Sequence, residues 1–191
     1  MFDLFDILQG KENDRDYKKK AVIVQGITGK FGMFHTKLMM QYGSNIVAGV
    51  TPGKGGQQFN GVPVYDNVAE AVKNTGAKIS IVFVPAPFFL DATKEALDNG
   101  ISLLVAIPEH IPIRDSLKCL EIARTKKATI IGPNTPGIII PNVIKLGIMP
   151  AEPFQSGSVV VFSRSGTLMY EVSHILSTSG YGQRISLGIG G

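Results

Sequence analysis

The sequence predicts a doubly wound α/β fold built on a parallel sheet. From residue 20 onward, short apolar segments rich in β-branched residues alternate with amphipathic segments of helical period. Segments that are apolar along their whole length are typical of parallel strands that helices cover on both faces. Glycine and proline, 22 and 11 of the 191 residues, recur between these segments and indicate short connections. The expected strands are 20–25, 46–50, 79–84, 102–107, 128–131, 158–162 and 184–189.

Five helices are expected between these strands, and turn residues mark several of their ends. Asp66 is expected to cap the second helix, and Gly76 lies just beyond its last residue. Gly100 follows the third helix, and Pro112 suits the first turn of the fourth because proline tolerates that position. The expected helices are 33–42, 67–75, 89–99, 112–126 and 168–179.

The pattern divides the chain into four parts. Residues 1–19 form an N-terminal arm, and residues 20–132 form a first domain with five of the strands. Prolines interrupt residues 133–157, which excludes a long helix, limits sheet pairing and predicts a linker. The alternation resumes over 158–191, but one strand–helix–strand unit cannot bury both faces of its sheet. These last residues are therefore expected to be the truncated start of a second α/β domain.

Composition and charge exclude several classes of protein. A hydrophobic share of 44% can build a core, so overall disorder is not expected. The single cysteine, Cys119, excludes a disulfide framework, and His35, His110 and His174 are too scattered for a metal site. A net charge of +4 from scattered residues favours an anionic ligand over nucleic acid. No targeting or membrane segment is recognised, so no membrane partner is expected and the expected location is the cytoplasm, or the mitochondrial matrix after removal of a eukaryotic transit peptide.

A glycine-rich turn follows the first expected strand. Gly26, Gly29 and Gly32 are spaced by three residues, with Thr28 and Lys30 between them. Glycines let a ligand approach the main chain, and the free amides of a helix start attract phosphate. The turn therefore predicts a phosphate site, although a tight strand–helix turn without a ligand would use the same glycines.

The loop after the second expected strand argues against a nicotinamide dinucleotide. An NAD site usually has an acidic residue there to bind the ribose hydroxyls. This chain instead has Lys54 within a glycine-rich loop over residues 51–56. The loop favours a phosphate-rich ligand and leaves an NAD dehydrogenase as a poor hypothesis, and the alternative is a mobile surface loop.

Further turns follow the remaining strands and are expected at the same edge of the sheet. Proline-containing turns over 84–87, 107–109 and 132–134 predict a rigid rim around a ligand. A second anion-binding turn is expected over 163–167, with Tyr170 facing the same opening. Capping of the following helix by a serine is the alternative for this turn.

These motifs, in this order and spacing, resemble the α-subunit family of succinyl-CoA synthetase. The resemblance runs from residue 20 to residue 191 and implies a Rossmann-like CoA-binding domain followed by a flavodoxin-like ligase domain, here incomplete. It rests on the segments QGITGKFGMFH (25–35), GVTPGKGG (49–56), VPAPF (84–88), GPN (132–134) and SRSGT (163–167).

The resemblance also implies roles for individual residues. Tyr170 matches the tyrosine that borders the carboxylic-acid site. The residues expected to stabilise the phosphate of a phosphohistidine are Ser163, Ser165, Gly166 and Thr167. The residues expected in the CoA site are Thr28, Gly29, Lys30, Phe31, Lys54, Pro85, Ile107, Pro108, Glu109 and Asn134.

The implied activity is that of an acid–CoA ligase. The family joins a carboxylate such as succinate to CoA while a nucleoside triphosphate is cleaved, through an acyl phosphate and a phosphohistidine. Its β subunit is the expected partner and would bring Mg and ATP or GTP. The phosphorylated histidine is expected beyond Gly191, so no catalytic residue is assigned here and this chain alone is expected to be inactive. A non-catalytic CoA-binding or regulatory module is the alternative.

Overall fold

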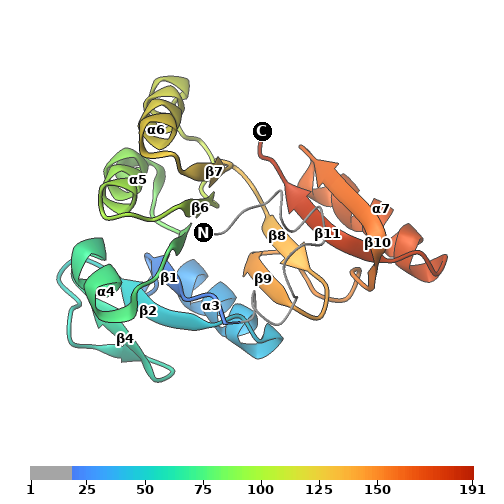
Figure 1. Ribbon diagram of the computed structural model, residues 1–191, viewed down its shortest axis with the longest axis horizontal. Coiled ribbons are helices and arrows are strands. Elements are labelled where there is room, and N and C mark those ends of the chain that lie inside the picture. The colour runs from blue at the N-terminus through green and yellow to red at the C-terminus, as the bar shows by residue number, and fades with distance from the viewer. Residues whose placement is uncertain (1–18) are drawn as a thin grey trace.

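The computed structural model describes residues 19–191, which form two sheets with helices packed against them (Figure 1). Most of the N-terminal arm expected over residues 1–19 lies outside the described residues. The first sheet has seven strands in the order β3-β4-β2-β1-β5-β6-β7, and all but β3 are parallel. Its strands are β1 (Val22–Gln25), β2 (Ile46–Val50), β3 (Gln58–Phe59), β4 (Val62–Tyr65), β5 (Ile79–Val82), β6 (Leu103–Ala106) and β7 (Thr129–Ile131).

The strand order of this sheet changes direction between β1 and β5. The chain runs outward from β1 through β2 to β4, then returns to pair β5 with the other side of β1. In doubly wound folds the crevice at such a point, at the carboxyl ends of the strands, is where ligands bind. The predicted fold class, a Rossmann-like doubly wound α/β unit, is confirmed.

The edge hairpin β3–β4 is absent from the predicted strands. Pro63 lies within β4 and pairs with Gln58 of β3 in antiparallel register. A proline and flanking glycines are typical of loops, and only pairing with β2 makes this short segment a strand. The sequence pattern therefore resembled a continuous loop.

Helices cover both faces of the first sheet. α4 (Val68–Thr75), α5 (Phe89–Asp98) and α6 (Ile113–Lys126) supply buried side chains to the core of one face, and α3 (Lys30–Tyr42) packs on the other. A short 3-10 turn, η1 (Ala86–Phe88), precedes α5.

Asn67, and not Asp66 as predicted, caps α4, because the Asn67 side chain accepts a hydrogen bond from the Glu70 amide at 2.9 Å. The Asp66 carboxylate instead accepts one from the Gly55 amide, also at 2.9 Å.

The segment predicted as a linker contributes two strands to the second sheet. Pro136 and Pro141 flank the first of these strands and lie outside it, so they do not interrupt its pairing. The strand order is β10-β11-β8-β9, with β10 and β11 parallel and the other pairs antiparallel. The elements of this part are β8 (Gly137–Ile140), β9 (Ile144–Gly147), β10 (Ser156–Ser163), α7 (Gly166–Thr178) and β11 (Gln183–Gly188).

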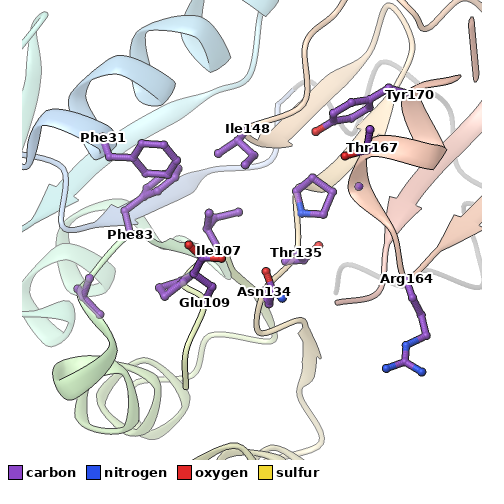
Figure 2. A pocket seen from close by; sticks show the side chains of 14 residues that line it. Phe31, Phe83, Ile107, Glu109, Asn134, Thr135, Ile148, Arg164, Thr167 and Tyr170 are labelled. Carbon is purple, nitrogen blue, oxygen red and sulfur yellow. The ribbon is translucent and has the colours of Figure 1, made fainter. Parts of the chain in front are cut away.

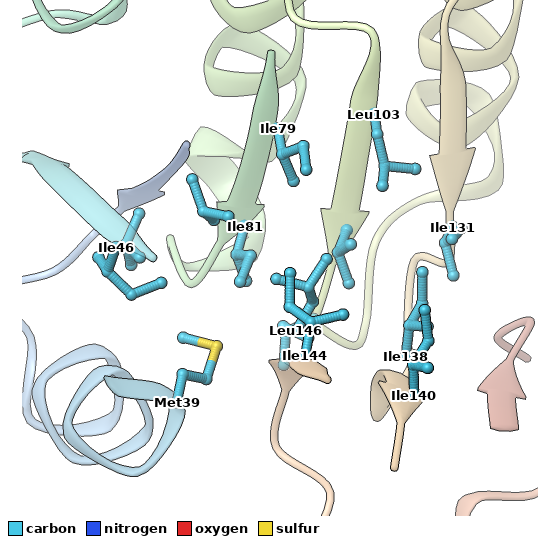
Figure 3. Close-up of a cluster of buried hydrophobic side chains, with 14 of the residues drawn as sticks. Met39, Ile46, Ile79, Ile81, Leu103, Ile131, Ile138, Ile140, Ile144 and Leu146 are labelled. Atoms are coloured by element: carbon cyan, nitrogen blue, oxygen red, sulfur yellow. The ribbon is translucent and has the colours of Figure 1, made fainter. Parts of the chain in front are cut away.

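The β8–β9 hairpin joins the two sheets through one hydrophobic core (Figure 3). Ile138, Ile144 and Leu146 are fully buried in the same cluster as Ile79 and Ile81 of the first sheet. Hydrogen bonds reinforce the contact between α3 and the hairpin: the Ser44 hydroxyl donates to the Lys145 carbonyl, and the Tyr42 hydroxyl accepts from the Asn142 amide. The hairpin therefore packs against both the first sheet and the C-terminal end of α3.

Within residues 19–191, none of the helices combines the length and apolar character needed to cross a lipid bilayer.

Candidate functional site

A cavity of about 440 Å³ lies between the two sheets (Figure 2). The first sheet contributes residues that follow β5, β6 and β7, together with Phe31 at the start of α3. The second part of the chain contributes Ile148, just after β9, and the first turn of α7 with Thr167 and Tyr170. The cavity thus opens at the carboxyl ends of the strands of the first sheet, the edge at which doubly wound folds bind ligands.

The glycine-rich turn after β1 is tight and leaves the start of α3 uncapped. The Gly29 amide donates to the Gly26 carbonyl, and a Cβ on Gly32 would lie 2.2 Å from that same carbonyl oxygen. α3 begins at Lys30, with Gly29 as a cap that makes no side-chain hydrogen bond. Gly32 is therefore needed for the turn itself, while the free amides of the first helical turn are available to an anion.

The loop that carries Lys54 is held by hydrogen bonds on both sides. The Lys54 amide donates to the Thr51 carbonyl at 3.1 Å, and the next amide, of Gly55, donates to the Asp66 carboxylate. Thr28 of the glycine-rich turn donates to the Thr51 hydroxyl at 3.2 Å. The loop is therefore anchored beside the glycine-rich turn, with the Lys54 side chain exposed to solvent.

Four aromatic rings form one wall of the cavity and the layer behind it. Phe31 and Phe83 face the cavity, with ring centroids 5.7 Å apart. His35 lies behind them, stacked on Phe83 and in edge contact with Phe31 and Phe34. The imidazole is buried, and its Nδ1 has no hydrogen-bond partner. The part of this wall that faces the cavity is apolar and suits an apolar part of a ligand.

The turn before α7 uses both of its serine hydroxyls internally. Ser165 caps α7 by accepting from the Leu168 amide, and the Ser163 hydroxyl donates to the Ser165 carbonyl and accepts from the Ser165 amide. Tyr170 lies one turn further along, in edge contact with Phe154, and burial raises the pKa of its phenol. The serines thus shape the turn, while Gly166 and Thr167 face the cavity.

Residues 17–110 match the family model described as CoA binding domain. The α subunit 2 of ADP-forming succinate–CoA ligase from Archaeoglobus fulgidus is 53% identical over 174 residues, 91% of this chain and 61% of that protein. The α subunit from Methanothermobacter thermautotrophicus is also 53% identical, over 88% of this chain and 57% of that protein. The chain is a homologue of succinate–CoA ligase α subunits. The family resemblance identified from the turn motifs is thereby confirmed.

The chain spans about 60% of the length of these α subunits, 61% and 57% of the two proteins. Solved structures agree with the fold. PH0766 from Pyrococcus horikoshii superposes with a TM-score of 0.77 at 22% identity, covering 93% of this chain and 42% of its own. The ATP citrate lyase of Methanothrix soehngenii, solved with citrate and coenzyme A, superposes with a TM-score of 0.75 at 22% identity, covering 92% and 32%. At this identity, the likeness concerns the fold alone.

The cavity of this α-subunit homologue brings together only part of the predicted site. The residues that stay outside it come from the turn after β1 and the start of α3, from the loops after β2 and β5, and from the serines whose hydroxyls hold the turn before α7. The predicted residues that line the cavity are Phe31, Ile107, Pro108, Glu109, Asn134, Gly166, Thr167 and Tyr170. The predicted residues that do not line it are Thr28, Gly29, Lys30, Lys54, Pro85, Ser163 and Ser165.

Six lining residues were not individually assigned to the site from the sequence, although Val84 and Arg164 lie in turns that were predicted to face the ligand. Phe83 is the second-to-last residue of the expected strand 79–84, so its position near the carboxyl end could have indicated it. Arg164 belongs to a quoted motif, but its side chain extends away from the other labelled side chains in Figure 2. Nothing in the sequence could indicate Ile148, because the preceding strand was not predicted. The six residues are Phe83, Val84, Thr135, Pro136, Ile148 and Arg164.

None of the histidines in residues 19–191 lines the cavity. Within the same residues, no three His, Cys, Asp or Glu side chains gather in a way that could hold a metal ion. Cys119 is buried in α6, where burial raises the pKa of its thiol.

We expect the stability of the protein to fall as the pH drops below about 6.5. Burial lowers the pKa of His35 below its ordinary 6.5, and the nearby Lys145 ammonium lowers it further. Below that pH the unfolded chain binds a proton at His35 that the folded chain does not, so acid favours unfolding by at most about 1.4 kcal/mol per pH unit.

Urea denaturation at pH 7.5 and 5.5 measures this loss. The variant His35→Gln should lose less stability between the two pH values than the wild type. The variant His174→Gln, which changes an exposed histidine of α7, should lose as much as the wild type. An equal loss in His35→Gln and wild type would contradict the assignment to His35.

Proposed function

We propose that this chain binds CoA across the carboxyl edge of its first sheet, as the CoA-binding part of an acid–CoA ligase α subunit. The observation that carries the proposal is the cavity between the sheets, where five of the ten predicted CoA residues gather. Lys30 is instead the first residue of α3, and Lys54 lies in the loop after β2, which is tied to the glycine-rich turn by the hydrogen bond from Thr28 to Thr51. An elongated ligand with an apolar thiol end and a phosphate-rich end suits both regions, and CoA has this shape and charge.

In this proposal the residues of the chain bind and orient the two ends of CoA. The aromatic wall of Phe31 and Phe83 packs against the apolar end, and the first-turn amides of α3 with Lys30 and Lys54 bind the phosphates. Bound CoA supplies the thiol that accepts the acyl group. The proposed reaction joins a small carboxylic acid such as succinate to that thiol, with cleavage of a nucleoside triphosphate through an acyl phosphate and a phosphohistidine.

The proposed partner is a succinate–CoA ligase β subunit, which would bring Mg and ATP or GTP. Tyr170 is proposed to border the carboxylic acid, and Ser163 to Thr167 to steady the phosphohistidine. Since no histidine of residues 19–191 lines the cavity, a non-catalytic CoA-binding module is the second candidate. Size-exclusion chromatography with the β subunit of the same organism separates the two: a stable complex supports the ligase, and its absence supports the module.

Isothermal titration of the folded chain with CoA is the direct test, and Lys54→Ala is its sharpest variant. We expect this variant to bind CoA about 5- to 30-fold more weakly, because it loses a charge-assisted contact to phosphate. Its affinity for acetyl-pantetheine, which lacks the nucleotide end, should stay unchanged. Lys73→Ala, which changes an exposed lysine of α4, controls for the loss of one positive charge. No binding of CoA to the wild type, or equal losses for both ligands in Lys54→Ala, would contradict the proposal.

A further inference from the structure

The hydroxyl of Thr135 joins two main-chain segments at the edge of the cavity. Thr135 is 2% exposed and lies in the connection between β7 and β8. Its Oγ1 donates a hydrogen bond to the carbonyl oxygen of Gly188, the last residue of β11, and accepts one from the Gly137 amide at 2.9 Å. Because the hydroxyl proton is engaged by Gly188, it is not available to a ligand in the cavity.

The two segments pack closely at this crossing. A Cβ on Gly188 would lie 2.5 Å from Cδ of Pro136, so only glycine lets β11 pass this proline. The next amide, of Ile189, donates to the carbonyl of Ser163 at the end of β10. The crossing therefore ties the connection before β8 to the carboxyl ends of β10 and β11, the strands that precede and follow α7 in the chain.

These contacts lie where two walls of the cavity meet. Thr135 and Pro136 belong to the wall on the side of the first sheet, and Gly166 and Thr167 belong to the wall formed by α7. The walls come close at their base, where a Cβ added to Gly166 would lie 3.5 Å from Pro136. A shift of β11 relative to Pro136 would therefore change the width of the cavity.

We propose that Thr135 is a positioning residue for the ligand of this cavity, and that its hydroxyl holds the two walls at their working separation. The proposal rests on the proposed binding of CoA. Thr135 acts through the main chain of Gly137 and Gly188, and its side-chain oxygen makes no bond to the ligand. Loss of the hydroxyl loosens both walls together and weakens the binding of CoA, although the hydroxyl itself makes no hydrogen bond to CoA.

Ser44 provides a matched control with the same bonding pattern away from the cavity. It is 5% exposed, donates to the Lys145 carbonyl at 2.6 Å and accepts from the Lys145 amide at 3.0 Å. Neither Ser44 nor Lys145 lines the cavity. Its removal should therefore cost stability without changing the affinity for CoA.

The experiment compares Thr135→Val, Thr135→Ser and Ser44→Ala with the wild type by thermal unfolding and by titration with CoA below the unfolding midpoints. Thr135→Val should raise the Kd for CoA about tenfold, the effect of one lost hydrogen bond. Thr135→Ser should stay within about twofold of the wild type, since it keeps the hydroxyl. Ser44→Ala should lower the midpoint and leave the Kd unchanged. An unchanged Kd in Thr135→Val with a lowered midpoint would overturn the proposal and leave Thr135 a purely structural role.

Hydrogen exchange separates failure of this inference from failure of the proposed function. Thr135→Val should speed exchange in residues 132–137 and 186–191 together, whether or not CoA binds. If the wild type does not bind CoA, the proposed function fails. If exchange in both segments is the same in Thr135→Val as in the wild type, the role of Thr135 is overturned. Should Thr135→Val not fold, Gly188→Ala displaces the same crossing with the hydroxyl in place, and an unchanged Kd in that variant is the contradicting result.

Discussion

Replacing Gly32 with valine is expected to abolish CoA binding and to lower the free energy of unfolding by about 2–4 kcal/mol. A Cβ at this position would lie 2.2 Å from the carbonyl oxygen of Gly26 and 3.1 Å from its carbonyl carbon. Both are main-chain atoms, so no side-chain rotation can relieve the overlap. Either the glycine-rich turn or the start of α3 must move, and with it the helix start that we propose for the CoA phosphates.

Urea denaturation and titration with CoA measure the two effects of Gly32→Val. Gly29→Ala is the matched control for stability in the same turn. Gly29 has φ −72° and ψ 149°, which any residue adopts, and its Cβ would make an ordinary contact at 3.4 Å with the Gly26 oxygen. We expect Gly29→Ala to change the free energy of unfolding by less than about 1 kcal/mol. Equal destabilisation by both variants would show that the close approach at Gly32 is not what constrains the turn.

Five of the seven strands of the first sheet could be predicted from the sequence because their signals are local; the exceptions are β3 and β4. Each of these five parallel strands is a continuous apolar run and each helix beside them is bounded by a turn residue, so neither depends on knowing the partner strand. The β8–β9 hairpin could not be predicted in this way. Pro136 and Pro141 lie just outside β8, and a proline directly beside a strand is compatible with pairing although it is also typical of a linker. Only the packing of Ile144 and Leu146 against the first sheet distinguishes a paired hairpin from a linker here.

The same distinction applies to the candidate site. Turns after successive parallel strands could be assigned to one edge, because the carboxyl ends of parallel strands meet there. Ile107, Pro108 and Asn134 lie together at the cavity for this reason. The opposite wall depends on how the second sheet packs on the first, which no local pattern specifies. Thr135 depends on both kinds of information. It directly follows the predicted turn 132–134, but its hydroxyl bonds to Gly188 of β11, about fifty residues later in the chain.

Truncation of Leu146 to alanine is expected to destabilise the whole molecule, by about 2–5 kcal/mol. Leu146 belongs to β9 in the second sheet and is 0% exposed. It lies in one cluster with Ile79 and Leu103 of the first sheet, so the cavity left by its side chain would open in the core that both sheets share (Figure 3). If the sheets unfold as one unit, this loss lowers the stability of the first sheet as much as that of the second.

Urea denaturation followed by far-ultraviolet circular dichroism, together with hydrogen exchange in the presence of urea, tests this expectation. In Leu146→Ala, protection in β1 and β5 should fall together with protection in β11, within a single transition. Ile175→Ala, at an α7 position that is 60% exposed, should change the free energy of unfolding by less than about 0.5 kcal/mol. A variant that loses protection in β11 alone would mean that the sheets unfold separately. The width of the cavity between them would then depend on local contacts such as those of Thr135, and the shared core would not contribute to it.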